Sequence, residues 1–349
     1  MPCSLLEELA TVMQEPFPAL RRLRFESEPF VTMPALPDTF LGGSAPCLQT
    51  IYIDGIPFPA APTLLLSAHD LVNVHLSEIP PTGYIPPEAM VASLAALPRL
   101  KYLTFGFEWG MSYPDRTHLP PISRTVLPAL TSFSFDGLFE YFEDLVAQID
   151  TPQLNCLGIR YLDQDEVTDF QIPQLCKFVD RSENLKLSPF RRADLLIGPN
   201  KVVIQLAHQG QSSFRLLIQE GALGQVVSQI SAMLSNVDRL SIRSESLGPN
   251  IDELGESIQW LELFRPFTAV KALSVDNELS WHIAFALHDV TGERAAEVLP
   301  ALELLCLEDK PVTSVEKFIT ARQNMGRPVS VIKKVREFWE RLKTLDVSE

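Results

Sequence analysis

One short phrase recurs along the chain and constrains its fold more than any other feature. The phrase reads L-x-x-[LIVF]-x-[LIVF]-x-x, with Val in place of the first Leu in two copies. Its apolar and polar residues alternate with a period of two, which predicts a strand with one buried face. The nine copies lie at Leu20–Ser27, Leu48–Gly55, Leu71–Glu78, Leu100–Phe107, Leu130–Gly137, Leu154–Tyr161, Val237–Ser244, Val270–Asn277 and Leu302–Asp309. Their starts are 23 to 33 residues apart outside the middle of the chain, which is typical of leucine-rich repeats.

The segments between the phrases have helical spacing. A Leu-Pro-x-Leu turn often precedes the strand, as at Leu97–Leu100, Leu127–Leu130 and Leu299–Leu302, because proline ends a helix and favours an extended predecessor. Helices that return the chain between parallel strands are expected, with right-handed crossovers. We predict them at residues 1–17, 86–97, 138–149, 172–180, 223–234, 252–264, 295–299, 312–323 and 331–343.

The middle of the chain departs from this pattern. Residues 193–197, 201–207 and 214–220 are strand-like and are separated by short turns, which predicts a strand followed by an antiparallel hairpin. We therefore expect a single α/β domain over residues 1–349, a leucine-rich-repeat-like right-handed βα solenoid with a curved parallel sheet and outer helices. Its parts are regular repeats at 15–184, the irregular strand and hairpin at 185–220, repeats at 221–310 and a helical cap at 311–349.

Composition excludes several classes of function. The formal net charge of −15 over 349 residues argues against nucleic acid and against an anionic membrane surface as partners. The five cysteines are scattered without a C-x-x-C pair, which favours reduced thiols over disulfides or zinc. We find no basic leader and no apolar run of membrane-spanning length. A cytoplasmic or nuclear protein is expected.

The sequence offers little support for an enzyme. Asp163, Asp165 and Glu166 suggest a metal loop but lack the other ligands and the glycine of a calcium site. His282 and His288 are six residues apart, outside the spacing of a helical zinc pair. No nucleophile elbow, P-loop or dinucleotide fingerprint occurs. We expect no cofactor, no metal and no catalysis, and a cryptic hydrolase remains a distant alternative.

Polar positions of the phrases form three lateral rows if the strands pair in register. The row that is richest in charge is Glu26, Asp54, Ser77, Gly106, Asp136 and Arg160, continued by Arg243, Asp276 and Glu308. Its carboxylates could recognise a basic segment of a partner protein. The alternative is that exposed strand positions tolerate polar residues of any kind.

The loop Phe105–Tyr113 is rich in aromatic residues. Trp109 and Tyr113 could anchor a partner, or the aromatic side chains could cover the edge of the core. The candidate partner-binding residues are Glu26, Tyr52, Asp54, His75, Tyr102, Trp109, Tyr113, Asp136, Arg160, Arg243, Asp276 and Glu308.

Several long stretches resemble a family of basidiomycete fungal proteins that carry an F-box and degenerate leucine-rich repeats. These stretches are GYIPPEAMVASLAALPRLKYLTFGF, LPALTSFSFDGLFEYFEDLVAQIDTPQL, QWLELFRPFTAVKALSV, GERAAEVLPALELLCLE and FITARQNMGRPVSV. The resemblance spans residues 20–331 and implies a leucine-rich-repeat-like domain. In complete members it implies an F-box that docks on the Skp-type adaptor of a cullin–RING ubiquitin ligase while the repeats select the substrate.

The chain departs from that family at its beginning. An F-box needs about 45 residues, opened by a Leu-Pro-x-Glu segment, but the first phrase already starts at Leu20. Either the chain is a shortened gene product or it works without the adaptor. The expected function is non-enzymatic protein binding, as the substrate-recognition part of a ubiquitin ligase. The alternative is a stand-alone scaffold or inhibitor.

Overall fold

The computed structural model describes residues 3–27, 33–37, 39–58, 61–108, 124–161, 170–187, 190–208, 213–245, 258–288, 290–308 and 312–332. Its contacts divide the chain into two compact units. The N-terminal unit comprises Met1–Glu166 with Ile172–Leu187, and the C-terminal unit comprises Val167–Gln171 with Ser188–Glu349. Each unit is described by itself below.

The N-terminal unit contains a sheet of parallel strands in the order β1-β2-β3-β4-β6-β8. These strands are β1 (Arg22–Glu26), β2 (Thr50–Asp54), β3 (Asn73–Ile79), β4 (Tyr102–Phe107), β6 (Ser132–Gly137) and β8 (Cys156–Tyr161). Each begins within one of the first six phrases, and only β3 continues past its phrase, by one residue. The predicted strands and their parallel pairing are confirmed. A small second sheet pairs β5 (Thr125–Val126) with β7 (Ile149–Asp150).

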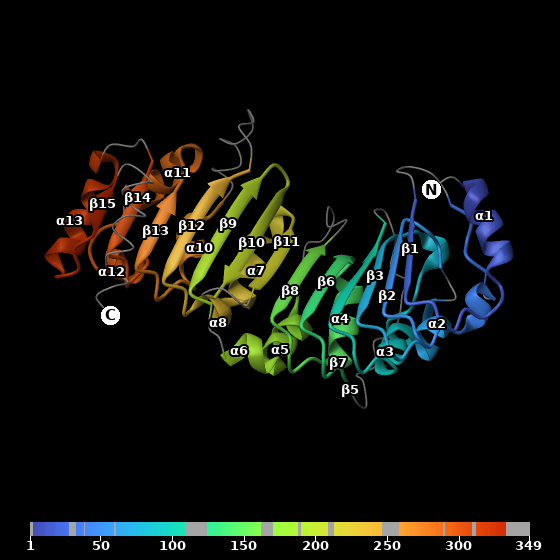
Figure 1. Ribbon diagram of the computed structural model, residues 1–349. Helices are drawn as coiled ribbons and strands as arrows, with labels where there is room; N and C mark the ends of the chain where they lie inside the picture. Colours follow the sequence, from blue (N-terminus) through green and yellow to red (C-terminus); the bar gives the residue numbers. More distant parts are fainter. Residues whose placement is uncertain are drawn as a thin grey trace. The chain divides into compact units, whose positions relative to one another are not determined.

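Helices of the N-terminal unit lie along one side of its strands (Figure 1). They are α1 (Cys3–Val12), η1 (Phe40–Gly43), α2 (Ala61–Ser67), η2 (Pro81–Gly83), α3 (Pro87–Ala95), α4 (Phe139–Ala147), α5 (Pro173–Arg181) and α6 (Glu183–Leu187). Consecutive helices from α2 to α5 contact one another. The apolar positions of each phrase, such as Leu103 and Phe105 on β4, are buried in the core, where each contributes about 1.5–3 kcal/mol.

The same two backbone contacts recur at the start of successive strands. The first Leu of a phrase donates its N–H to a carbonyl three residues earlier, as from Leu100 to Leu97 at 3.2 Å and from Leu302 to Leu299 at 2.9 Å. The carbonyl of the next residue then accepts two N–H groups from the following strand. Lys101 O, for example, accepts from Thr131 N at 2.9 Å and from Ser132 N at 3.0 Å. This pattern sets the register in which each phrase pairs with the next.

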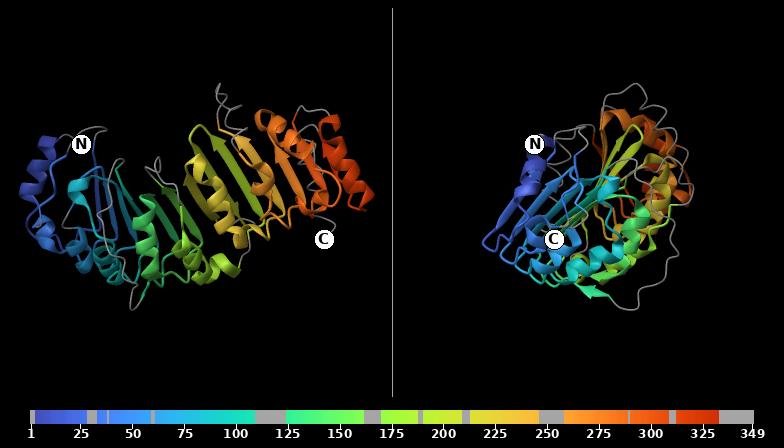
Figure 2. Two further views of the ribbon diagram at one scale, coloured as in Figure 1. Left: turned by 180° about the vertical axis from the view of Figure 1, so that it is seen from behind. Right: turned by 90° about the vertical axis from the view of Figure 1, so that its right-hand side faces the viewer.

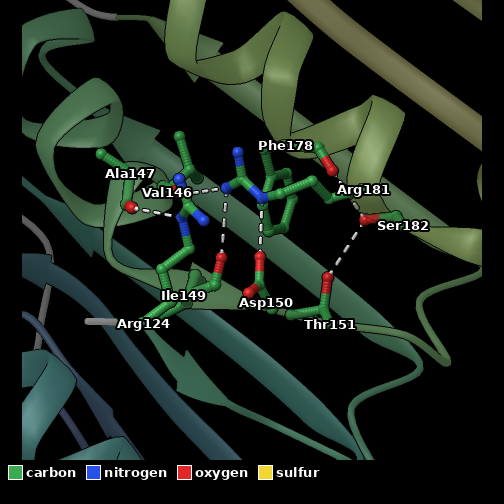
Figure 3. A network of polar contacts seen from close by, with 9 residues as sticks. All are labelled: Arg124, Val146, Ala147, Ile149, Asp150, Thr151, Phe178, Arg181 and Ser182. Carbon is green, nitrogen blue, oxygen red and sulfur yellow. Dashed lines mark hydrogen bonds and ion pairs between the residues drawn. The ribbon is translucent and has the colours of Figure 1, made fainter.

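A polar network connects neighbouring repeats of the N-terminal unit on its helical side (Figure 3). Arg181, at the end of α5, donates from Nε to Asp150 Oδ1 at 2.6 Å and from Nη2 to Val146 O at 2.9 Å. Val146 lies in the last turn of α4, so the guanidinium also satisfies a carbonyl at the negative end of that helix. Ser182 and Thr151 add a hydroxyl contact of 3.2 Å between the same two repeats.

A carboxylate replaces the usual capping residue of α5. Glu143 on α4 accepts hydrogen bonds from Gln174 N at 2.6 Å and from Leu175 N at 2.9 Å, which are donors without partners inside the first turn of α5. Burial raises the pKa of Glu143 to about 7, against the opposing effect of the two backbone N–H groups. The contact holds one helix against the start of the next.

The C-terminal unit contains strands in the order β11-β10-β9-β12-β13-β14-β15. They are β9 (Arg192–Gly198), β10 (Lys201–Ala207), β11 (Ser213–Ile218), β12 (Arg239–Ser244), β13 (Ala272–Val275), β14 (Leu304–Leu307) and β15 (Ser330–Ile332). The pairs of β10 with β9 and with β11 are antiparallel, as predicted for the middle of the chain. The remaining pairs, from β9 to β15, are parallel.

The helices of the C-terminal unit are short apart from two. They are η3 (Glu220–Ala222), α7 (Leu223–Gln229), α8 (Ser231–Leu234), α10 (Trp260–Phe264), α11 (Asn277–His288), α12 (Arg294–Glu297), η4 (Val312–Val315) and α13 (Glu316–Asn324). Our sequence patterns missed α11, the longest of these. The helix predicted at 331–343 is wrong at its start, because Val331 and Ile332 belong to β15; its other residues lie outside the described part of the chain.

The chain is therefore an α/β protein whose strands are mostly parallel, and the strand order of neither unit closes a barrel. In both units helices pack against one side of the strands (Figure 2). Within the described residues, Cys47, Cys156, Cys176 and Cys306 are not joined in disulfides. Within the described ranges, no helix has the length and apolarity needed to cross a membrane.

Candidate functional site

The side of the N-terminal sheet that faces away from the helices carries the lateral rows predicted from the sequence. The register aligns Arg24, Tyr52, His75, Thr104, Ser134 and Gly158 across six strands. Burial alternates along each strand, and these residues are exposed or half-buried while their neighbours are buried. We call this surface the open face, and its charged and aromatic residues make it the candidate site.

Three side chains form a stack at one end of the open face. The guanidinium of Arg24 lies over the ring of Tyr52, 4.2 Å from the ring centroid. The other side of that ring stacks on His75, with centroids 4.0 Å apart and planes 3° from parallel. Arg24 also donates to Glu26 at 2.9 Å. The stack holds two rings and a cation in fixed positions on adjacent strands.

His75 continues into a polar chain on β2 and β3. Ser77 Oγ donates to Asp54 Oδ1 at 2.7 Å and lies 2.8 Å from His75 Nε2, so the hydroxyl accepts from the imidazole if Nε2 carries the proton. Burial lowers the pKa of His75, whereas Asp54 raises it and Arg24 lowers it further. The neutral imidazole is thus the favoured form near neutral pH.

The contact between Ser77 and His75 has the length of a nucleophile–base hydrogen bond but not the arrangement of a hydrolase triad. In a triad the carboxylate orients the histidine. Here Asp54 accepts from the serine itself, which directs the hydroxyl proton toward the carboxylate and away from the imidazole. The geometry favours a fixed hydrogen-bonding surface over an activated nucleophile.

A second charged group lies around Gly106. The register of β3 shifts between Leu76 and Ile79, and Glu78 adopts a left-handed φ of 49° within this irregularity. Such a conformation is costly for a residue other than glycine and is often found at functional positions. Glu78 lies 4.0 Å from Arg160 on β8, although β4 and β6 intervene between their strands.

Gly106 leaves space for this approach. A Cβ atom at Gly106 would lie 2.8 Å from Asp136 Cβ and 3.0 Å from its carbonyl oxygen. Asp136 in turn accepts two hydrogen bonds from Arg160, at 3.0 Å from Nε and 2.8 Å from Nη2. Burial raises the pKa of Glu78, with Asp54, Asp136 and Glu108 acting in the same direction and Arg160 opposing them.

The charges of the open face do not balance. Glu26, Asp54, Glu78 and Asp136 share this face with three guanidinium groups, those of Arg22, Arg24 and Arg160. The surface is therefore negative, as expected from the sequence, but most of its carboxylates are already engaged in hydrogen bonds. Our sequence analysis did not select Arg24 or Glu78 as binding residues, although Arg24 begins the row that contains Tyr52 and His75. The left-handed turn that brings Glu78 onto the face has no signal in the residue pattern.

The other predicted site residues belong neither to the stack of Arg24, Tyr52 and His75 nor to the charged group around Gly106. Tyr102 is half exposed on β4, whereas Trp109 and Tyr113 lie outside the described residues, as do Asp163, Asp165 and Glu166. Arg243, Asp276 and Glu308 belong to the C-terminal unit. There Asp276 accepts hydrogen bonds from the N–H groups of Ser244 and Leu279, so it caps the start of α11.

Two of the three corresponding rows of the C-terminal unit are largely buried, whereas Arg243, Asp276 and Glu308 of the third row are exposed or half-buried. Ala272, Leu304 and Cys306, which the rows place on the outward side of their strands, form a buried apolar cluster together with Ile332. Ser241 and Ser274 are buried as well. Our sequence analysis also did not include β9 in these rows. In the structure, Asp194 on β9 pairs with Ser241 on β12 and lies 3.8 Å from the guanidinium of Arg243. Because two of the three rows are buried there, we place the candidate site on the N-terminal unit.

Within the described ranges, no group of histidine, cysteine, aspartate or glutamate side chains is placed to hold a metal ion. His282 and His288 both lie on α11, and His288 Nδ1 lies 3.3 Å from Ser314 O. Comparisons with protein-family models, curated proteins and solved structures found no match to this chain.

Proposed function

We propose that the chain is a leucine-rich-repeat-like βα solenoid that binds another protein through the open face of its N-terminal unit. The repeated backbone contacts support the solenoid. One backbone carbonyl in a repeat accepts two N–H groups from the next repeat. This contact recurs in the N-terminal unit, where Thr131 is one of the donors, and in the C-terminal unit, where Lys271 is one of the donors. One structural unit copied along a chain produces such a series.

The observation that carries the binding role is the fixed polar and aromatic network on the open face. Arg24, Tyr52 and His75 are stacked, and Asp136 holds Arg160 with two hydrogen bonds. Side chains that are already ordered lose little conformational entropy when a partner binds. Tyrosine and arginine are also the residue types that contribute most to binding energy at protein interfaces.

The charge of the open face favours a partner with a basic segment. Burial raises the pKa of Glu78, and the neighbouring carboxylates of Asp54, Asp136 and Glu108 raise it further. A lysine or arginine side chain placed among them would relieve this repulsion. Electrostatic attraction of this kind increases the association rate and decreases with salt.

The resemblance to F-box proteins with leucine-rich repeats supports a more specific role, the selection of substrates for a cullin–RING ubiquitin ligase. The proposed alternative is a stand-alone scaffold or inhibitor that occludes its partner. Co-purification of the native gene product with a Skp-type adaptor would favour the ligase role. Stoichiometric partner complexes that form without the adaptor and without ubiquitin transfer would favour the scaffold.

The binding face can be tested by charge reversal. We expect the double variant Asp54→Lys with Glu78→Lys to reduce capture of the native partner at least about tenfold, the effect of disrupting a small set of charge contacts. Glu7→Lys with Glu8→Lys makes the same change in net charge on exposed positions of α1 and serves as the control. Equal capture by both double variants and the unchanged protein would refute the assignment of the face.

A further inference from the structure

A buried arginine lies in the last repeat of the C-terminal unit. Arg322 on α13 is only 1% exposed. Its Nη1 donates to Ala295 O at 3.4 Å, and its Nη2 donates to Pro300 O at 3.3 Å and to Leu302 O at 2.8 Å. Ala295 lies in α12, and the other two carbonyls belong to the connection from α12 to β14. Helix α12 packs against α13 (Figure 1).

The guanidinium of Arg322 has no acidic partner in the part of the chain that the structure describes. Its buried Nε–H also has no hydrogen-bond partner there. Burial and the neighbouring Arg327 both lower the pKa of Arg322. A buried cation without a counter-ion is costly, and the cost decreases when an anion binds beside it.

A tight turn places a second arginine next to the first. Helix α13 ends before Gly326, which has a left-handed φ of 71°, the usual glycine conformation after a helix. Gly326 N donates to Gln323 O at 3.0 Å and Arg327 N donates to Arg322 O at 2.9 Å. The turn therefore fixes the backbone of Arg327, whose side chain is exposed.

Both arginines line one cavity of about 710 Å³. Ser330 contributes a hydroxyl group to the same wall and Glu303 a single carboxylate, and the remaining wall includes Pro300 and Leu302. The cavity has the size of a small-molecule site. The cavity wall thus carries two guanidinium groups and one carboxylate. It is locally positive, although the formal net charge of the chain is −15.

We propose that this cavity binds the phosphate group of a small molecule, with the exposed Arg327 as its cationic contact, Ser330 as a hydroxyl donor and the buried Arg322 as a positive charge in the wall. A guanidinium group donates to oxyanions through paired N–H groups. Paired N–H donors and a hydroxyl around one space suit a tetrahedral anion with several acceptor oxygens better than a carboxylate. The volume leaves room for the rest of a phosphorylated ligand. This site is independent of the open face of the N-terminal unit.

Titration calorimetry of the full chain with inorganic phosphate tests the proposal, with sodium chloride and sodium acetate at matched ionic strength as comparison salts. We expect saturable binding of phosphate only. Arg327→Ala should weaken it about tenfold or more, the loss of a hydrogen bond to a charged group. Arg215→Ala, which removes an exposed arginine of β11 in the same unit, should bind phosphate like the unchanged protein.

A second measurement avoids variants of the buried residue. The ¹H–¹⁵Nε signal of Arg322 should shift on addition of phosphate and should not shift with acetate. Unchanged phosphate affinity in Arg327→Ala, equal binding of acetate, or an Arg322 signal that is insensitive to phosphate would each overturn the assignment. Loss of binding in Arg215→Ala as well would do the same, because it would show a diffuse charge effect.

Discussion

The rings of Tyr52 and His75 lie face to face on adjacent strands, with centroids 4.0 Å apart and planes 3° from parallel. Register alone places the two residues opposite each other. The parallel orientation is set by contacts on either side, since Arg24 covers the outer face of Tyr52 and Ser77 contacts His75 Nε2. This relationship makes the titration of His75 a direct probe of the open face.

We predict that His75 titrates below its ordinary pKa of 6.5, because burial disfavours the imidazolium. Tyr52→Ala removes the ring that covers it, so the pKa of His75 should rise toward 6.5. Tyr102→Ala, on the same face but outside the stack, should leave it unchanged. The measurement is an NMR titration of the His75 ring signals, and a wild-type pKa at or above 6.5 would contradict the structure.

The stability of the protein should follow the same titration. A lowered pKa in the folded state means that the unfolded chain binds the proton more tightly, so His75 contributes stability above about pH 6.5 that is lost as the pH falls. The difference in stability between the unchanged protein and Tyr52→Ala should therefore shrink as the pH falls from 7.5 to 5.5, a comparison in which the opposite contribution of Glu143 cancels.

Gly106 provides a second test, on the packing of the open face. In Gly106→Ala the new methyl group would meet the Cβ atom and the carbonyl of Asp136, and it cannot move without shifting β4 or β6. We expect a loss of about 1–3 kcal/mol in the free energy of unfolding. Gly158→Ala is the matched control on β8, because its Cβ would lie 3.5 Å from Ser134 Oγ, an ordinary contact, and the change should be neutral or slightly stabilising. Urea denaturation of both variants decides between these outcomes.

The strands of this chain were predictable because their signal is local and repeated. Each phrase buries alternate residues against helices on one side, so the period of two appears in the sequence itself. The hairpins after β9 were equally visible from their short turns. Helix α11 was missed because it begins at the end of the eighth phrase, Val270–Asn277. There Asp276 accepts from Leu279 N, so the strand ends and a helix follows.

The candidate site was predictable only in part, since its geometry depends on contacts between repeats. The rows place Tyr52, His75 and Asp136 on one surface, and register confirms this. The left-handed turn at Glu78 and the burial of Cys306 arise from tertiary packing. A row of polar or small residues therefore does not distinguish an open face from a covered one.

Arg181 offers a test of the contacts that join successive repeats. We predict that Arg181→Met lowers the free energy of unfolding by about 1–3 kcal/mol, because Asp150 and the end of α4 lose charge-assisted hydrogen bonds in a partly buried site. Arg99→Met removes a comparable pair with Asp70, but those side chains are 63% and 42% exposed, so it should cost about 0–1 kcal/mol. Equal losses in urea denaturation would show that the Arg181 network adds no more than a surface pair.

Glu143 should give the N-terminal unit an unusual dependence of stability on pH. Its folded-state pKa of about 7 lies above that of an unfolded glutamate, so the folded state retains the proton more tightly. The resulting stability is complete below about pH 4.5 and is lost as the pH rises to 7, by about 3 kcal/mol for this shift.

The variant Glu143→Gln isolates this effect, because glutamine cannot ionise and keeps one of the two oxygens that accept from Gln174 N and Leu175 N. We expect the stability of this variant to change less than that of the unchanged protein between pH 5 and pH 8. At pH 8 the variant should be the more stable of the two proteins. Asp144→Asn, the adjacent residue on α4, should retain the full pH dependence. Chemical denaturation across this range, with hydrogen exchange of the α5 amides as a local readout, provides the comparison. A wild-type curve with the same slope as that of Glu143→Gln would mean that the buried carboxylate is ionised throughout, held in that form by the two backbone donors at the start of α5.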